Sequence, residues 1–291
     1  MKTDDNKYLF LLILLSLVFL ALNSILCKAA LLHNSIDPYS FTFFRLLFAM
    51  IMLLSIYFYR FKSITFIKNK NWLSSFMLFV YAISFSYAYI NIDAGFGALL
   101  LFGVVQVVMV VSSLFHKEKL TFLKIAGLFL SLTGLIYLIY PKDSFEVSLP
   151  HALLMILAGI AWALYSVLGK KSIDAIGNTT DNFIKACLYI TIFYFIFTVD
   201  TLYITQEGLL LAIISGAITS ALGYIIWYQV LPQIKIVTAS VIQLFVPIIA
   251  IGLSVLFLNE SLTLDLIIST IIVTVGIVLT IFSKKQATFK A

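Results

Sequence analysis

Charged residues are scarce in this chain. Only 11% of its 291 residues are charged, whereas a soluble globular domain has about 25%. Hydrophobic residues make up 62%, and the mean hydropathy is +1.10. This composition excludes a sizeable soluble domain and predicts a protein that crosses a lipid bilayer many times.

Residues that carry catalytic or metal chemistry are also few. The two cysteines, Cys27 and Cys187, lie in apolar segments and belong to no C-x-x-C motif. We therefore expect neither a disulfide framework nor a metal site. The chain has no H-E-x-x-H motif of a metalloprotease and no G-x-x-x-x-G-K-[ST] motif for direct use of ATP. We expect no catalytic residues and no cofactor.

Long polar segments are absent as well, and ten apolar runs are joined by short connections. A helix of about 20 apolar residues rises 1.5 Å per residue and crosses the roughly 30 Å hydrocarbon core. The sequence thus predicts an all-α membrane protein with ten transmembrane helices, at about residues 8–32, 39–59, 72–91, 95–115, 121–140, 150–169, 182–200, 208–230, 236–258 and 262–283.

Basic residues are distributed unevenly between the two sides of these helices. With the N-terminus in the cytoplasm, most lysines and arginines fall in cytoplasmic segments, and little beyond Lys28 and Lys142 falls outside. We interpret the net charge of +6 as an orientation signal and not as a nucleic-acid surface. Both termini are expected in the cytoplasm.

The two halves of the chain repeat one another. A shift of 142 residues places Glu118 on Glu260 and Lys28 on Lys170 without a gap in either segment. Such matches among polar residues carry more weight than matches among leucines, which apolar helices share by composition. The pattern predicts an internal duplication with repeats at residues 1–145 and 146–291. Because each repeat has five helices, the second enters the membrane upside down, and the repeats are inverted.

The ninth predicted helix has one polar face. Ser240, Gln243, Pro247, Ala250 and Ser254 fall on this face at steps of three or four. Pro247 breaks the hydrogen bonding of the helix, which a membrane tolerates only where neighbours satisfy the freed carbonyl. We expect the face to look inward.

Several motifs resemble one known group of transporters. Each repeat's fourth helix ends in Phe-x-x-Glu-x-Leu-Thr, at residues 115–121 and 257–263, and a glycine lies midway down the next helix, at Gly134 and Gly276. Together with Arg45 in the second helix, these features are similar to the drug/metabolite transporter superfamily, EamA type. The motifs specify the fold well and the substrate poorly.

The resemblance implies a ten-helix carrier of the bacterial inner membrane. Its central cavity would be lined by helices one to four and six to nine, with the fifth and tenth outside as braces. One departure is that the family's proline in the fourth helix of a repeat is present as Pro247 but is Val105 in the first half. The two halves are therefore expected to bend unequally.

Polar and aromatic residues deep within the apolar runs are the candidates for binding a substrate. Trp162 and Tyr224 carry polar atoms that need partners at this depth. For the amides, hydrogen bonds between helices are as good an explanation as substrate contact. Burial of the Arg45 charge in a membrane costs free energy unless the side chain faces a water-filled interior or extends to the membrane surface. Arg45 is therefore expected either to form a structural pair with another residue of the protein or to bind an anionic group of the substrate. The expected substrate-binding residues are Asn23, Arg45, Tyr81, Trp162, Tyr165, Tyr224 and Gln243.

Other charged residues have simpler interpretations. Glu118 and Glu260 open the next helix, so each is expected to cap that helix, with ion coupling as the alternative. Lys28 and Lys170 end equivalent helices and are expected to snorkel to lipid headgroups. Lys185 is expected at a membrane interface.

The favoured function is a secondary transporter of a small metabolite, in contact with the lipid bilayer and acting as a monomer or weak dimer. Export, and cargo such as an amino acid, follow from the family resemblance alone. The alternative is a proton-coupled exporter of lipophilic cations, which requires a carboxylate near the middle of the membrane. No such carboxylate is expected here, since acidic residues are placed in connections and at helix ends. An intramembrane enzyme is disfavoured because no reactive pair is evident.

Overall fold

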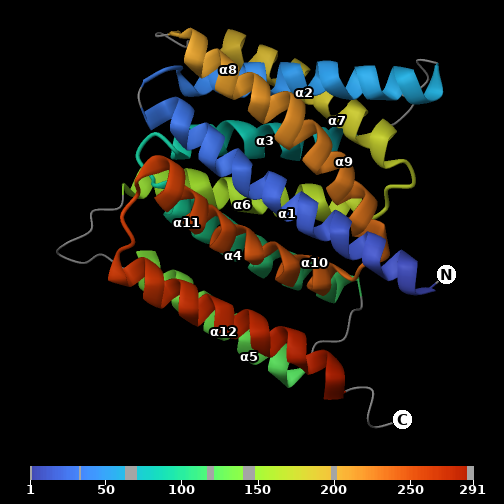
Figure 1. The fold of residues 1–291 in the computed structure, drawn as a ribbon, viewed down its shortest axis with the longest axis vertical. Helices are drawn as coiled ribbons and strands as arrows, with labels where there is room; N and C mark the ends of the chain where they lie inside the picture. Colours follow the sequence, from blue (N-terminus) through green and yellow to red (C-terminus); the bar gives the residue numbers. More distant parts are fainter. Residues whose placement is uncertain are drawn as a thin grey trace.

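The computed structural model describes residues 2–32, 34–62, 71–116, 121–139, 148–197 and 202–286. These segments are almost entirely helical (Figure 1). The helices are α1 (Lys2–Leu32), α2 (Pro38–Phe61), α3 (Trp72–Ala88), α4 (Ala94–Phe115), α5 (Phe122–Ile139), α6 (Leu149–Gly169), α7 (Ala175–Ile196), α8 (Gln206–Ile214), η2 (Ser215–Ser220), α9 (Ala221–Val230), η3 (Leu231–Gln233), α10 (Ile236–Gln243), α11 (Phe245–Leu258) and α12 (Leu264–Gln286).

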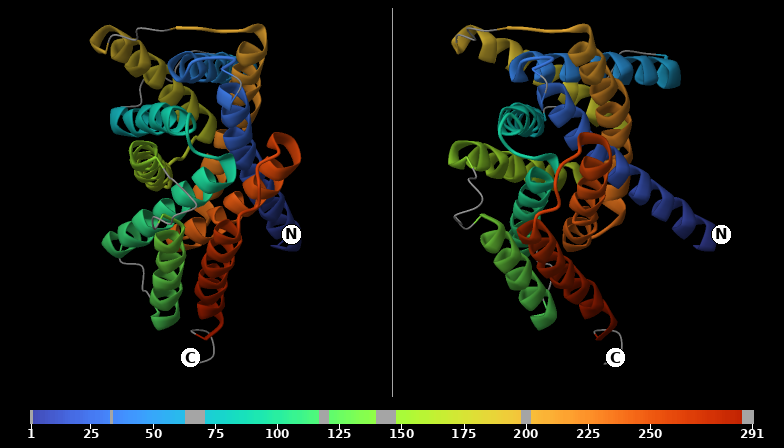
Figure 2. Two further views of the ribbon diagram at one scale, coloured as in Figure 1. Left: turned by 90° about the vertical axis from the view of Figure 1, so that its left-hand side faces the viewer. Right: turned by 60° about the vertical axis from the view of Figure 1, so that its left-hand side comes forward.

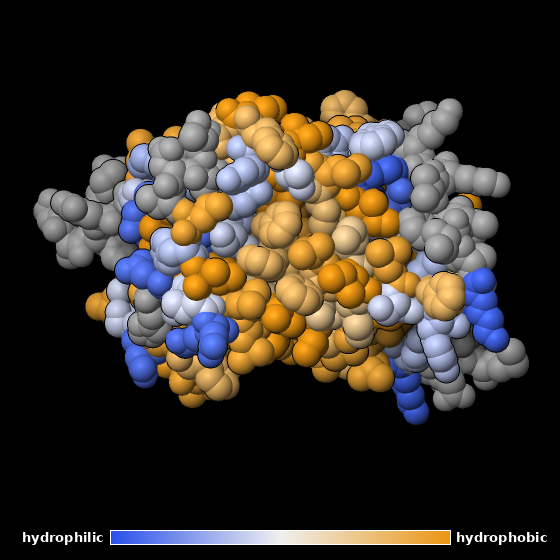
Figure 3. All heavy atoms as spheres, turned by 90° about the horizontal axis from the view of Figure 1, so that it is seen from above, coloured by the Kyte–Doolittle hydropathy of each residue, from blue (hydrophilic) through white to orange (hydrophobic). Residues whose placement is uncertain are grey.

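These elements form ten transmembrane helices within the described residues, because α8 to η3 make one crossing and α10 with α11 another. Six of the crossings are long and apolar enough to span a bilayer by length and composition alone, and α3, α5 and α12 contain shorter apolar stretches. Figure 3 shows a wide hydrophobic band across one face of the molecule, with hydrophilic residues towards either end. The predicted all-α membrane fold is confirmed.

The helices run between two sides of the molecule, which lie at the right and left of Figure 1. We call the side where α1 begins and α12 ends the N-terminal side. It also holds the ends of α2 and α6 and the start of α10. The opposite side, which we call the distal side, holds the connections α1–α2, α3–α4 and α11–α12. Consecutive crossings therefore alternate in direction, and the two five-helix repeats have opposite orientations.

Equivalent contacts in the two repeats reproduce the shift of 142 residues. Lys28 Nζ donates to the carbonyl of Tyr89 at 3.2 Å, just after α3. Lys170 Nζ donates to the carbonyls of Leu231 at 3.5 Å and Ile234 at 2.6 Å, just after α9. Each ammonium thus satisfies carbonyls at a helix C-terminus, which the helix dipole favours. The expectation that these lysines snorkel to headgroups is wrong, because a nearer acceptor lies inside the protein.

The fifth and last crossings, α5 and α12, pack along each other at one edge of the molecule (Figures 1 and 2). Gly127 and Gly276 lie face to face, and a side chain on either would meet the backbone of the other helix. Ser131 Oγ also approaches the carbonyl of Val273 at 3.5 Å. Small residues at this crossing permit close approach, so the pair packs beside the other eight crossings, as the resemblance implied.

The break expected near Pro247 is present. α10 ends at Gln243, and α11 begins at Phe245 after a single turn residue, Leu244. Gln243 lies four residues before Pro247, so its carbonyl is the one that a proline leaves without a partner. In the first repeat, where Val105 takes the place of the proline, α4 continues without a break. The two halves therefore bend unequally, as predicted.

The seventh crossing begins earlier than the sequence suggested. α7 starts at Ala175 rather than near residue 182, because the carboxylate of Asp174 accepts from the Gly177 N–H at 3.0 Å and caps the helix. Consequently Asp181 and Lys185 lie within the helix, are buried, and form an ion pair four residues apart. The interfacial position expected for Lys185 is wrong, and so is the confinement of acidic residues to helix ends.

Two features inferred from the sequence lie outside the described residues. These are Glu118 and the boundary placed between residues 145 and 146.

Candidate functional site

The deep aromatic residues of three helices meet at one place. The Trp162 ring lies 5.0 Å from Tyr81, 5.5 Å from Tyr165 and 4.9 Å from Tyr224, measured between ring centroids. The four side chains come from α3, α6 and α9, and all are buried. Aromatic pairs at these separations attract one another beyond the area they bury. They form an apolar wall at the middle of the bundle.

Arg45 of α2 lies against this wall. Its Nη2 donates to the hydroxyl groups of Tyr224 at 2.8 Å and Tyr81 at 3.4 Å, and its Nε donates to Ser220 Oγ at 2.9 Å. The guanidinium also faces the rings of Tyr81 and Phe85 at 5.5 and 5.2 Å. Nη1 has no hydrogen-bond partner, although Arg45 is only 1% exposed. Within the described residues no carboxylate pairs with this cation.

Asn23 of α1 joins the same network through Ser220. Its Oδ1 accepts from Ser215 Oγ at 3.0 Å, Thr219 Oγ1 at 2.7 Å and Ser220 Oγ at 3.1 Å. All three hydroxyl groups come from η2, a π-helical segment in the middle of the eighth crossing. Such segments occur frequently at functional sites because they redirect side chains. The Nδ2 of Asn23 has no partner.

Gln243 completes the set. Its Oε1 accepts from Trp162 Nε1 at 2.6 Å, and its Nε2 approaches Met109 Sδ of α4 at 3.3 Å. The rest of its helical face is buried too, so the inward orientation predicted for that face is confirmed. All seven residues proposed from the sequence therefore lie in one connected group, which we call the central cluster: Asn23, Arg45, Tyr81, Trp162, Tyr165, Tyr224 and Gln243.

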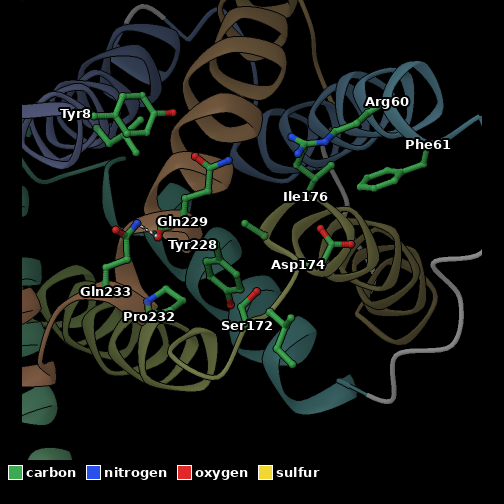
Figure 4. A pocket seen from close by; sticks show the side chains of 13 residues that line it. Tyr8, Arg60, Phe61, Ser172, Asp174, Ile176, Tyr228, Gln229, Pro232 and Gln233 are labelled. Atoms are coloured by element: carbon green, nitrogen blue, oxygen red, sulfur yellow. Dashed lines mark hydrogen bonds between the residues drawn. The ribbon is translucent and has the colours of Figure 1, made fainter. Parts of the chain in front are cut away.

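Two pockets open on the N-terminal side, and Tyr228 lines both. The larger has a volume of about 530 Å³ and the smaller about 240 Å³. Figure 4 shows Arg60 and Phe61 of α2 on one side of the larger pocket and Gln233 of η3 on the other, with Tyr228 between them.

Tyr228 also separates these pockets from the central cluster. Its ring centroid lies 4.8 Å from that of Tyr165 with the two rings tilted by 37°, and its hydroxyl donates to the Tyr165 carbonyl at 3.1 Å. Ser74 Oγ lies 3.1 Å from the same hydroxyl, and Asn182 Nδ2 approaches it at 3.4 Å. Gly169 leaves room for the ring, since a Cβ there would come within 2.6 Å of it. Residues of three other crossings, on α3, α6 and α7, thus hold this side chain between the pockets and the central cluster.

The distal side is closed by contacts between the repeats. Both carboxylate oxygens of Glu260 accept backbone N–H bonds at the start of α4, from Ala94 at 2.6 Å and Gly95 at 3.1 Å. On the same side of the molecule, Ile36 and Ile204 form an isolated β-bridge between the α1–α2 connection and the segment before α8. Glu260 therefore caps a helix of the other repeat, and the expectation that it caps the next helix, α12, is wrong. The chain turns back at Asn259, whose φ of 54° is left-handed, and this places the carboxylate over α4.

Sequence reasoning missed Ser220 and Tyr228. Ser220 is one of several small residues in the eighth crossing, and a single π-helical turn is too short to be recognised in the sequence. Tyr228 lies four residues after Tyr224 and shares its face of α9, which was a usable signal.

A buried cluster built from both inverted repeats, with pockets beyond Tyr228 on one side and the Glu260 contacts on the other, is typical of a multi-pass membrane transport protein. The model of the EamA-like transporter family matches residues 7–140 and 149–282. The chain belongs to the EamA-like transporter family, which confirms the resemblance to the drug/metabolite transporter superfamily.

Relatives and a solved structure agree with this assignment. An uncharacterized protein of Pseudomonas aeruginosa is 39% identical over 275 residues, 94% of each chain. The uncharacterized transporter YoaV of Bacillus subtilis is 26% identical over 66% of this chain and 68% of its own. A crystal structure of a protein with 14% identity superposes with a TM-score of 0.71 over 95% of this chain and 98% of that one. At that identity the likeness shows the fold alone.

Proposed function

We propose that the protein is a secondary transporter that exports a small metabolite, such as an amino acid or a related compound, by alternating access. The observation that carries this proposal is the composition of the central cluster. Asn23, Arg45 and Tyr81 come from the first repeat, and the other four residues come from the second. A site held between two inverted repeats is the arrangement that can face each side of a membrane in turn.

The chemistry of the cluster favours a ligand with an apolar body and a polar end. Four aromatic rings supply an apolar wall, while the amides and the guanidinium supply a few polar groups, which is how most small-molecule sites are built. The pocket of about 530 Å³ on the N-terminal side is large enough to admit such a molecule.

In this proposal the N-terminal side faces the cytoplasm, and the direction of transport, export, rests on the family resemblance. Arg60, Lys62, Lys171 and Lys235 lie at helix ends on that side, and an excess of basic residues is typical of cytoplasmic connections. In this conformation the substrate would enter from the cytoplasmic pockets past Tyr228 and leave when the contacts of Glu260 open.

A carrier of lipophilic cations fits the cluster less well. Such a carrier needs a carboxylate that exchanges protons for the cation, and the described central cluster contains Arg45 and no acid. Asp181 is buried elsewhere on α7 and pairs with Lys185.

The proposal is tested by comparing extracellular and intracellular metabolites of a deletion strain and an overexpressing strain. A matched pair of variants, Trp162→Phe and Trp227→Phe, assigns the effect to the site. Each removes one buried indole N–H bond, to Gln243 and to Ser166 respectively. We expect overexpression to raise the excretion of one or more metabolites, Trp162→Phe to change their amounts, and Trp227→Phe to match the wild type at equal membrane levels. Identical profiles of the two strains would overturn the proposal.

A further inference from the structure

The guanidinium of Arg45 is the most unusual charge in the described structure. It lies seven residues into α2, about 10 Å below the start of that helix. An arginine at such depth costs several kcal/mol unless it is compensated. The three groups that it bonds, Ser220, Tyr81 and Tyr224, are neutral hydroxyls. These hydroxyls satisfy hydrogen bonds, and the rings of Tyr81 and Phe85 attract the cation, but no carboxylate of the described residues pairs with it.

Two of the unsatisfied atoms in the central cluster, Arg45 Nη1 and Asn23 Nδ2, can only donate, and a third, the Tyr165 hydroxyl, can donate or accept. Both N–H groups of Arg45 Nη1 lack an acceptor. The amide of Asn23 is oriented by three hydroxyl donors on its Oδ1, which leaves its Nδ2 as the free end, also without an acceptor. Ser220 Oγ links the two residues, because it accepts from Arg45 Nε and donates to Asn23 Oδ1. The site thus offers one positive charge and unfilled N–H groups, and needs an acceptor that bears a negative charge.

We infer that the transported substrate carries a carboxylate, which binds Arg45 Nη1 and Asn23 Nδ2 while its apolar body lies against Trp162. This inference rests on the proposed function. A carboxylate accepts several N–H bonds, and charge-assisted bonds of this kind are about twice as strong as neutral ones. One guanidinium matches one carboxylate, whereas a phosphate monoester would bring a second negative charge that the described cluster does not balance.

Binding requires the cluster to rearrange, because its side chains are packed together in this structure. Arg45 can retain its bonds to Ser220 and Tyr224 while Nη1 receives the ligand. The substrate's carboxylate supplies a counter-charge for Arg45, whose removal from the pair would leave a buried charge unpaired.

The test uses probes that share a body and differ in the end group. Phenylpropanoate, indole-3-acetate and hexanoate are each compared with the primary amide and the amine of the same skeleton. Binding to the purified full-length protein is measured by intrinsic tryptophan fluorescence and by the shift in melting temperature. We expect at least one carboxylate to bind the wild type about tenfold or more tightly than its amide.

Variants then assign this preference to Arg45. Arg45→Gln is expected to abolish the preference for carboxylate over amide, and Arg45→Lys is expected to retain part of it. Lys235→Gln, which alters an exposed basic residue at the start of α10 that lines neither pocket, is expected to leave it unchanged. The ratio of carboxylate to amide binding is the readout, because a change in stability alone affects both probes alike.

Equal or tighter binding of amides or amines by the wild type would overturn the inference, and so would a carboxylate preference that survives Arg45→Gln. The proposed function would stand in both cases if metabolite profiles still depend on Trp162. Failure of every probe to bind would overturn the carboxylate inference, and unchanged metabolite profiles in addition would overturn the proposed function.

Discussion

The hydrogen bond between Trp162 and Gln243 joins the two kinds of group that define the central cluster. The indole N–H has one acceptor, Gln243 Oε1 at 2.6 Å, on the helix that Pro247 interrupts. Gln243 therefore either positions the aromatic wall for a substrate or holds α6 and α10 together. Truncation of the Gln243 side chain would change substrate preference in the first role and stability in the second.

Gln243→Ala separates these roles. If Gln243 serves the site, we expect altered substrate preference with a nearly normal melting temperature. If it serves packing alone, stability in detergent falls by about 0.6–2 kcal/mol and selectivity stays as it was. A melting curve and a transport assay on the same purified variant give both readings. Ser240→Ala, which removes a buried hydroxyl of the same helix bonded only to the Val237 carbonyl at 2.9 Å, is the control.

The individual site residues could be found from the sequence because polarity is rare in apolar helices. Asn23, Arg45 and Gln243 stand out against leucine and isoleucine, and a buried polar group must find a partner. The partners themselves could not be found. Ser220 and Tyr228 resemble many other small and aromatic residues, and only the packing of distant helices brings them to Asn23 and Tyr165.

Among the elements, the start of α4 shows how the repeats hold one another. Its first N–H groups have no acceptor within the helix, and the carboxylate of Glu260 supplies one from the other repeat. A negative charge at this end of a helix is also favoured by the helix dipole.

Glu260→Ala should therefore lower stability in detergent by about 1–2 kcal/mol. Glu207→Ala is the matched control, since Glu207 lies exposed in the first turn of its own helix, α8. We expect this control to cost less than half as much. Equal losses for the two variants, measured by denaturation of the purified proteins, would show that the contact with α4 contributes nothing of its own.

The elements themselves were predicted well where apolar runs are continuous and poorly where polar residues enter a helix. The Gly177–Asn178 pair looked like a connection, yet Asp174 caps α7 ahead of it and the polar turn is helical. η2 was not predicted either, because a π-helical segment of 6 residues is too short to leave a periodic pattern in the sequence. The break before Pro247 was predictable since proline removes a particular hydrogen bond.

At the scale of the whole molecule, coupling of transport to a proton gradient depends on which carboxylate side chains line the substrate's path. The described central cluster has no carboxylate, and the buried Asp181 is already paired with Lys185. We therefore expect transport in proteoliposomes to run down the substrate's own gradient without an obligatory proton gradient. The measurement is uptake at a fixed substrate gradient and clamped voltage, with and without a pH gradient. Transport that stops when the pH gradient is removed would contradict this expectation and direct attention to Asp181.

The central claim is that Tyr228 closes the cluster from the N-terminal side and Glu260 closes it from the distal side. Native Cys27 lies between the two closures. It is fully buried, and its Sγ lies 3.8 Å from Ser86 Oγ. The same Ser86 hydroxyl accepts from Thr42 Oγ1, and Thr42 lies one turn before Arg45 on α2. In a Cys187→Ser background Cys27 is the only thiol of the chain, so it reports access from either side.

The most direct measurement is the rate at which a membrane-impermeant thiol reagent modifies Cys27 in vesicles of both orientations. Tyr228→Phe should raise the rate from the N-terminal side alone, and Glu260→Ala should raise it from the distal side alone. Trp227→Phe and Glu207→Ala should behave like the parent. Rates that rise equally from both sides in either variant, or in neither, would contradict an alternating-access carrier with closures at these two residues.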